Sequence, residues 1–314
     1  MFAAAHLTQD SLRELLGEER SPAADRLLLH LLAVCPECRE AGGDLLELAE
    51  RGAIRPPFGP VDVELARSRA QAPALWAELL ALPSIERRRV VRDRRFLSWG
   101  LAERLAEESV AAQDAREAID LARLAIAIAR RIPPDDPFEE GWRVQLEALA
   151  VVHLAAARLR FGDREGAASA LRRMERLWQR ADSIGDVLGY RPRMVELAGR
   201  VLAGLGEETR ALAAFEAARK AYSSQDRTLD AARVAIETAI HHARAGRDAD
   251  ARHLARALPA ALDENDPAAP ALALFRAAAE EGTLTPGLAE EIHRQLERER
   301  AAIGSAFPAP ESSG

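Results

Sequence analysis

The chain has two cysteines, and they stand in a C-x2-C arrangement at Cys35 and Cys38, with His30 five residues before the first. Thiolate and imidazole are the ligands that a tetrahedral zinc site prefers. Pro36 suits the first turn of a helix and pushes Cys35 out of the helical region, so Cys35 is predicted at a helix junction. Amides at a helix N-terminus lower the pKa of a thiol and favour metal binding. The spacing therefore predicts a zinc site.

A closed structural zinc site needs a fourth ligand, and His6 is the best candidate. It lies just before Thr8, Gln9 and Asp10, which resemble a cap for a helix over residues 11–16. A helical hairpin would bring this start back to the cysteines. Two neutral imidazoles and two thiolates balance Zn²⁺ and leave no open position for a substrate, so one structural zinc is expected. Two readings stay open beside it, namely free thiols beside a packed histidine and a thiol redox switch that expels zinc.

Residues 6–50 resemble the zinc-binding anti-sigma domain of bacterial sigma-factor regulators. That family carries His-x3-Cys-x2-Cys with an upstream His or Cys, and here four residues separate His30 from Cys35. The resemblance implies that His6, His30, Cys35 and Cys38 are the ligands. It also implies a protein partner, for which a sigma factor is a candidate.

The charge distribution bears on that partner. The chain carries a net charge of −7, and residues 1–50 hold ten acidic residues against four arginines, which gives −6. This excess favours a basic protein surface over nucleic acid as the partner of the N-terminal module. The start of the chain lacks the pattern of a signal peptide, and no apolar run is long enough for a membrane span. A cytoplasmic protein without a membrane segment is expected.

Proline- and glycine-rich stretches divide the chain into four predicted regions. Residues 1–50 form the zinc-binding module, 51–62 a Pro- and Gly-rich linker, 63–304 a helical domain, and 305–314 a disordered tail. Alternating β-branched runs are absent, so the predicted class is all-α. The expected helices span 63–81, 84–108, 113–131, 138–161, 164–182, 187–205, 207–223, 227–245, 247–261, 267–281 and 286–302.

The predicted helices repeat. Gly162, Gly206 and Gly246 each separate two helices, and an alanine follows each glycine five residues later, at Ala167, Ala211 and Ala251. The residue nine after each glycine is apolar: Leu171, Phe215 and Ala255. A weaker copy starts at Gln113 and continues through Ala118, Ala122 and Ala125. Glycine supplies a left-handed C-cap, and small residues let paired helices approach closely. The region thus resembles a tetratricopeptide-like (TPR-like) α-solenoid of antiparallel helix pairs.

Three other groups of residues were weighed. Six arginines between 87 and 95 could dock nucleic acid or the acidic N-terminal module of the same chain, or could form a solvated helix face, on which Arg88, Arg92 and Arg95 would share one stripe. His241, His242 and His253 have no further ligand at a suitable spacing. The four tryptophans are interpreted as packing anchors: Trp76, Trp99, Trp142 and Trp178. Motifs of phosphate-binding loops, serine hydrolases and zinc proteases are absent, so a non-enzymatic protein is expected.

The whole chain also resembles a group of bacterial proteins that join a zinc-finger-like segment to degenerate helical repeats, as in residues 95–103 and 271–278. Two functions compete. The first is an anti-sigma-type regulator whose zinc module binds the partner. The second is a TPR-type scaffold whose solenoid groove binds a partner peptide, with the zinc module only structural.

Overall fold

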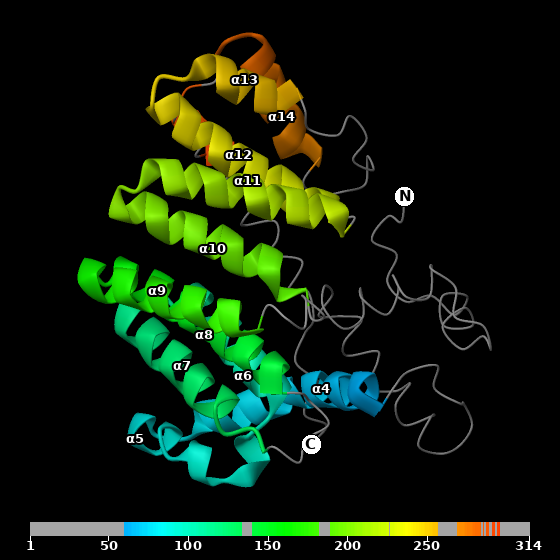
Figure 1. Cartoon of the computed structure of the whole chain (residues 1–314), viewed down its shortest axis with the longest axis vertical. Helices are drawn as coiled ribbons and strands as arrows, with labels where there is room; N and C mark the ends of the chain where they lie inside the picture. The colour runs from blue at the N-terminus through cyan, green and yellow to red at the C-terminus, as the bar shows by residue number, and fades with distance from the viewer. Residues whose placement is uncertain are drawn as a thin grey trace, which may run out of the picture. The chain divides into compact units, whose positions relative to one another are not determined.

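The computed structural model describes residues 60–133, 140–181, 189–225, 227–256 and 269–283, together with 285, 287, 288, 291, 292, 294 and 295. These residues form helices and turns without a strand, which confirms the all-α class for this part of the chain (Figure 1). The predicted zinc module over 1–50, most of the linker over 51–62 and the tail over 305–314 lie outside it. The α-helices are α4 (Pro60–Ala81), α5 (Ser84–Arg87), α6 (Trp99–Ala111), α7 (Ala115–Ala129), α8 (Glu140–Arg160), α9 (Arg164–Ala181), α10 (Tyr190–Leu205), α11 (Glu208–Ser224), α12 (Thr228–Arg244), α13 (Asp248–Arg256) and α14 (Ala269–Glu280).

Most predicted helices agree with these bounds to within three residues at the ends that the structure describes. The first helix begins at Pro60 rather than at residue 63. The single helix predicted over 84–108 is wrong. It is replaced by α5, two 3-10 turns, η2 (Val90–Arg92) and η3 (Arg94–Phe96), and then α6.

Two capping side chains explain that break. The Asp93 carboxylate accepts a hydrogen bond from the backbone N–H of Arg95 and starts η3, and the Ser98 hydroxyl accepts from Leu101 and starts α6. Such local bonds to the backbone compete with a continuous helix. The predicted stripe of arginines along one helix is therefore wrong as well, because the segment is not one helix.

The repeated glycines end their helices as predicted. Gly162, Gly206 and Gly246 have φ of 88°, 84° and 70°, the left-handed region that glycine adopts most easily. The amide after each glycine bonds to the carbonyl five residues earlier, as in Asp163 N–H to Arg158 O at 2.9 Å. This is the Schellman arrangement. It reverses the chain in the same way at each of these turns.

The small residues of the repeat are buried as well. Ala167 and Ala211 are fully buried, and Ala251 is almost so. Each amide five after a glycine closes the first turn of the new helix, as in Ala167 N–H to Asp163 O at 2.9 Å. The weaker copy behaves alike, because Ala118, Ala122 and Ala125 are also fully buried. Within each of the two units described below, consecutive helices thus pack closely in a solenoid-like arrangement.

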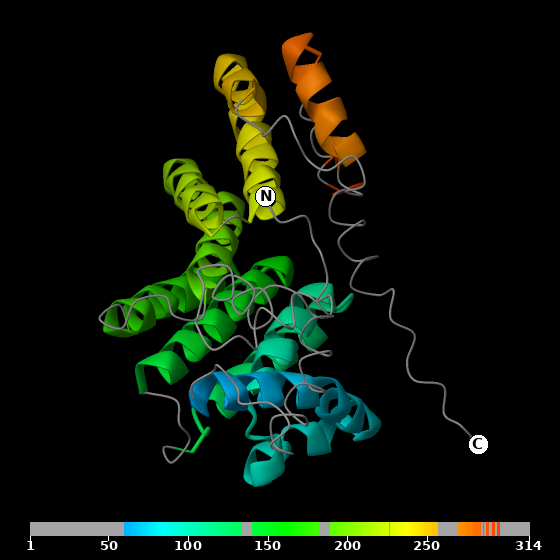
Figure 2. The same cartoon turned by 90° about the vertical axis from the view of Figure 1, so that its right-hand side faces the viewer.

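The chain divides into two compact units, residues 1–190 and 191–314. In the described part of the first unit, α6 packs on α4, α7 and α8, and α8 also packs on α7 and α9. Figure 2 shows α4 lying across this group of helices. In the second unit, α12 packs on α11 and α13, and α13 on α14, around Ile236, Phe275 and Ile292.

One close crossing fixes α4 against α6. A Cβ at Gly100 would lie 2.3 Å from the backbone oxygen of Ser68, so only glycine fits there. The Ser68 hydroxyl accepts a hydrogen bond from the Gly100 amide at 2.9 Å, which helps to cap α6. Among the described helices, none combines the length and the apolar character that a bilayer crossing requires.

Candidate functional site

The predicted zinc ligands His6, His30, Cys35 and Cys38 lie outside the described residues. Within the part of the chain that the structure describes, no three His, Cys, Asp or Glu side chains gather as metal ligands. The most concentrated polar cluster of the second unit lies instead on α10 and α12. We call it the arginine array.

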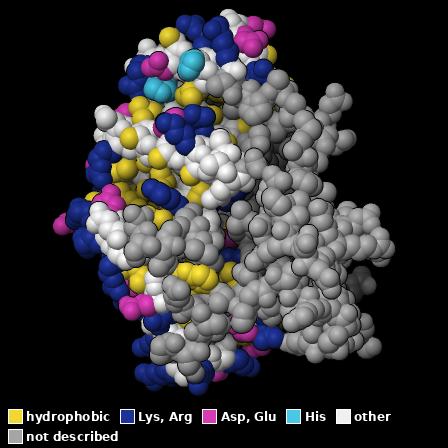
Figure 3. Space-filling model, turned by 45° about the vertical axis from the view of Figure 1, so that its right-hand side comes forward, with side chains coloured by type: hydrophobic (Ala, Val, Ile, Leu, Met, Phe, Trp, Pro, Cys, Tyr) yellow, Lys and Arg dark blue, Asp and Glu magenta, His cyan; other side chains and the backbone are white. Residues whose placement is uncertain are grey.

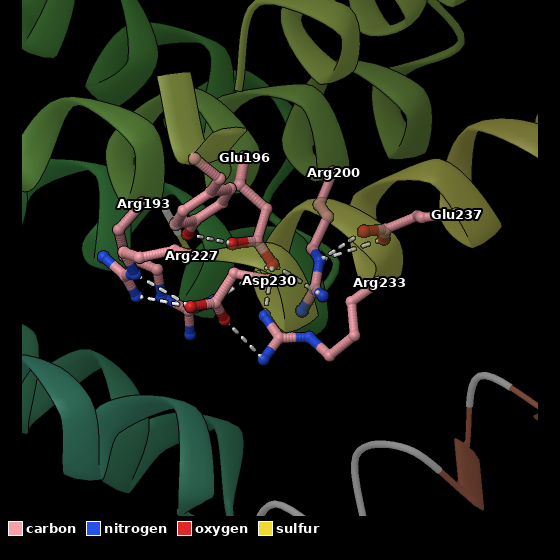
Figure 4. Close-up of polar contacts among 8 residues, drawn as sticks. Arg193, Glu196, Arg200, Arg227, Asp230, Arg233 and Glu237 are labelled. Atoms are coloured by element: carbon pink, nitrogen blue, oxygen red, sulfur yellow. Dashed lines mark hydrogen bonds and ion pairs between the residues drawn. The ribbon is translucent and has the colours of Figure 1, made fainter. Parts of the chain in front are cut away.

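The arginine array combines four guanidinium groups, three carboxylates and one phenol. Figure 4 shows the side chains of α10 and α12 converging around Glu196. Its members are Arg193, Glu196 and Arg200 on α10, Tyr222 on α11, Arg227 in the turn before α12, and Asp230, Arg233 and Glu237 on α12.

Glu196 is the centre of the array and is fully buried. Its Oε1 lies 3.1 Å from Nη1 of Arg193, 2.9 Å from Nη2 of Arg200 and 3.4 Å from Nη2 of Arg233. The hydroxyl of Tyr222 donates to Oε2 at 2.6 Å. Both carboxylate oxygens therefore have partners, as a buried charge requires.

The electrostatics keep Glu196 ionised. Burial alone would raise its pKa, but the guanidinium groups around it outweigh burial and hold the pKa well below its usual range. Burial, together with the carboxylates of Glu196 and Asp230, raises the pKa of Tyr222 above its usual range. The phenol is thus protonated at neutral pH and serves as a hydrogen-bond donor.

Two further carboxylates hold the outer arginines in place. Asp230 accepts from Nε of Arg227 at 2.9 Å and lies 2.9 Å from Nη1 of Arg233. Glu237 accepts from Nε of Arg200 at 3.0 Å. Four guanidinium groups against three carboxylates leave the array with a net charge of +1.

Two arginines at the edge of the array still have donors to offer. Among the described residues, Glu196 is the only hydrogen-bond partner of the Arg193 guanidinium, and Asp230 that of Arg227, which also lies over the Tyr222 ring at 4.6 Å. Their side chains are 21% and 14% exposed, so each arginine lies partly at the surface beside its buried partners. A guanidinium has five N–H donors arranged in a rigid fork that matches a carboxylate or phosphate. The array can therefore bind an anionic group.

A second polar network lies in the first unit and differs in burial. Arg69 on α4 donates twice to Glu103 on α6, at 2.7 and 2.6 Å, and both side chains are buried. Tyr190 donates to Glu103 and accepts from the indole of Trp99 at 2.8 Å. Burial, reinforced by Glu103, raises the pKa of Tyr190 well above its usual range. This network fixes the packing of the first unit and presents little to a ligand.

Of the histidines and tryptophans weighed from the sequence, His253 is exposed and the others lie in packing positions. His241 stacks on Phe215 with 5.3 Å between ring centroids, and His242 accepts from Nε of Arg247 at 2.9 Å. Burial and the neighbouring Arg247 lower the pKa of His242. Trp99 is almost fully buried, which confirms it as a packing anchor, and the other three tryptophans are half-buried.

Sequence reasoning missed the arginine array. The signal was present as Arg193, Glu196 and Arg200 at spacings of three and four, and as a similar set from Arg227 to Glu237. Those spacings are also the ones of ordinary surface ion pairs on a solvated helix. Only the packing of α10 against α11 and α12 shows that these charges share one buried centre.

Comparisons with known proteins do not indicate a function for this chain. No family model matches the chain, and no curated protein matches it. Among solved structures, the crystal structure of BtubC (BKLC) from P. vanneervenii is similar, with 19% sequence identity and a TM-score of 0.48. The match covers 79% of this chain and 95% of that chain. A function for this chain must therefore be argued from its own residues.

Proposed function

We propose that this chain is a non-enzymatic regulatory protein that binds a protein partner. In this proposal the TPR-like helical repeats hold an acidic segment of the partner at the arginine array. The N-terminal residues form an anti-sigma-like module with one structural Zn²⁺ on His6, His30, Cys35 and Cys38. A sigma factor is one candidate partner.

The observation that carries the proposal is the construction of the array. Arg233 is only 2% exposed and Glu196 is fully buried, so the inner charges are held rigidly. Arg193 and Arg227 are then positioned before any partner arrives. A side chain that is already ordered loses little conformational entropy on binding, and a charge-assisted bidentate bond is among the stronger hydrogen bonds.

The alternative is a TPR-type scaffold in which the solenoid alone binds the partner and the zinc module only stabilises the chain. The acidic excess of residues 1–50 favours the regulatory form, because a module with a net charge of −6 is suited to a basic partner surface. The two forms differ in one respect. Loss of zinc should weaken partner binding in the regulatory form and should leave it unchanged in the scaffold.

The experiment is quantitative capture of partners from the native host by the full-length chain. The test variant is Arg193→Ala/Arg227→Ala. It removes two guanidinium groups but strands no carboxylate, since Glu196 keeps Arg200, Arg233 and Tyr222, and Asp230 keeps Arg233. The matched control is Arg210→Ala/Arg219→Ala, which removes two arginines that pair with Glu207 and Glu216 along α11.

We expect a partner that the wild type and the control retain and that the array variant loses, with retention falling as salt rises. A third variant, Cys35→Ser, separates the two forms. Equal retention of every captured protein by the array variant and the control would contradict a partner-binding role of the array.

A further inference from the structure

The second charged surface of the molecule is the segment 86–96, which we call the basic segment. It holds six arginines against Glu86 and Asp93, a net charge of +4 in a chain of −7. Figure 3 shows Lys and Arg side chains gathered at the lower end of the molecule, where Figure 1 places α5. The arginines are Arg87, Arg88, Arg89, Arg92, Arg94 and Arg95.

Two buried side chains and one hydrogen bond hold the backbone of the basic segment in place. Val90 and Phe96 are buried, and Nη1 of Arg131, in the turn after α7, lies 3.4 Å from the carbonyl oxygen of Val91. The two short 3-10 turns between these points hold the intervening arginines at the surface. A surface with a fixed backbone loses little conformational entropy when it binds.

The charges of the basic segment are poorly neutralised within the described residues. Five of its six arginines are exposed. Arg88 pairs with Asp120 at 2.9 Å and Arg95 with Glu78 at 3.1 Å, and exposed pairs of this kind contribute only about 0–1 kcal/mol. Arg89 and Arg92 have no side-chain partner among the described residues. The basic segment therefore presents a largely uncompensated positive charge to solvent, which attracts an acidic surface.

The chemistry of the surface favours an acidic protein segment over single-stranded nucleic acid. Single strands are held by bases that stack on exposed aromatic rings. The aromatic residue of the basic segment, Phe96, is 3% exposed and cannot serve in this way. The acidic excess of the chain lies in residues 1–50, whose net charge of −6 complements the +4 of the basic segment.

The N-terminal residues can also reach this surface. Helix α4, with 22 residues, is about 33 Å long and separates the basic segment from Pro60. The nine residues 51–59 span up to about 30 Å when extended. A compact module of fifty residues has a radius of gyration of about 10 Å and so extends about 25 Å. The extended residues 51–59 and the module together are therefore longer than α4, so the module can reach the basic segment.

We propose that the basic segment is an intramolecular docking site for the acidic residues 1–50. The contact competes with the partner for the N-terminal module and so regulates the proposed function, on which this regulatory role rests. Tethering makes the docking partner effectively millimolar, so a weak electrostatic contact suffices. Raised salt or a basic partner surface releases the module.

The test uses zero-length cross-linking in the full-length chain. Arg89→Lys/Arg92→Lys keeps both charges and introduces two amines, in a chain whose single lysine is Lys220. A carbodiimide then joins these amines to carboxylates within ion-pair distance, and mass spectrometry identifies the joined peptides. We expect links to carboxylates within residues 1–50 that fall about tenfold between low salt and 1 M salt, where the Debye length is about 3 Å.

The control is Arg172→Lys/Arg176→Lys on α9, where both arginines are also exposed. Links to residues 1–50 at equal yield from α9 would show random collision and overturn the proposal. Links confined to Asp93, Asp120 or other local carboxylates would overturn it too. A mixture of isotopically labelled and unlabelled chains should give links within one chain, and mixed links would assign the surface to a second copy instead.

The cross-links need no partner, so this result is independent of partner capture. If no partner is captured while the links form, the docking site stands and the proposed function fails. If a partner is captured while the links are absent, the docking site is refuted and the proposed function stands.

Discussion

Glu196→Gln tests the idea that one buried carboxylate organises the arginine array. The substitution keeps the shape of the side chain and removes its charge. Three guanidinium groups lie within 3.4 Å of the carboxylate, and the side chain is fully buried. Arg200 and Arg233 keep Glu237 and Asp230 as partners, while Arg193 loses its own.

The expected change in the free energy of unfolding follows from the partners that each arginine keeps. Removing one partner of a buried ion pair costs about 3–5 kcal/mol, because the remaining charge is left without compensation. Two of the three arginines keep a second carboxylate, so we expect the lower end, about 3 kcal/mol in the free energy of unfolding. For a chain region of this size, that corresponds to a fall in Tm of roughly 10 °C.

The assay is urea unfolding of the full-length chain, followed by circular dichroism at 222 nm. Glu207→Gln is the control, since Glu207 pairs with Arg210 at the exposed start of α11. We expect this control to change the free energy of unfolding by less than about 1 kcal/mol. If Glu196→Gln costs no more than the control, the reasoning that a buried charge centre holds the array is refuted.

Four further predictions concern the pH dependence of Glu196, two kinds of glycine substitution and the zinc content. The pKa of Glu196 is held below the usual glutamate value of about 4.3. The stabilisation of the folded state by its charge is therefore complete above that pH and is lost as the pH falls toward the folded-state pKa. Acid titration should thus destabilise the wild type more steeply than Glu196→Gln. Gly100→Ala should destabilise by more than about 3 kcal/mol, because its Cβ meets the backbone of α4. Gly162→Ala should cost about 1 kcal/mol through its φ of 88°, and Gly287→Ala, with open space around it, should be nearly neutral, as measured by urea unfolding. Protein purified without chelator should hold about one zinc per chain and Cys35→Ser should lose most of it, whereas elemental analysis without zinc would contradict the predicted site.

The repeat turns could be predicted from the sequence because their determinants are local. A glycine that follows an apolar helical pattern marks a left-handed cap, and Gly162, Gly206 and Gly246 all adopt it. The alanine five residues later is then placed in the first turn of the next helix. This is why the helix bounds from α7 to α12 agree closely with the structure.

The prediction failed where a side chain competes with the helix or where distant residues meet. Asp93 and Ser98 cap new starts inside an apolar pattern that favoured one helix. Glu196 looks like a surface residue in sequence, and it becomes a buried centre only because Tyr222 and Arg233 approach from other helices. These partners lie 26 and 37 residues away, beyond the reach of any periodicity argument.

The most direct test of partner binding at the arginine array is the dissociation constant of the captured partner, measured by titration calorimetry at two salt concentrations. The full-length wild type, Arg193→Ala/Arg227→Ala and the control Arg210→Ala/Arg219→Ala are compared. We predict that the array variant binds at least about tenfold more weakly at low salt and depends less on salt, while the control matches the wild type. Equal dissociation constants for the three proteins at both salt concentrations would contradict the role of the array.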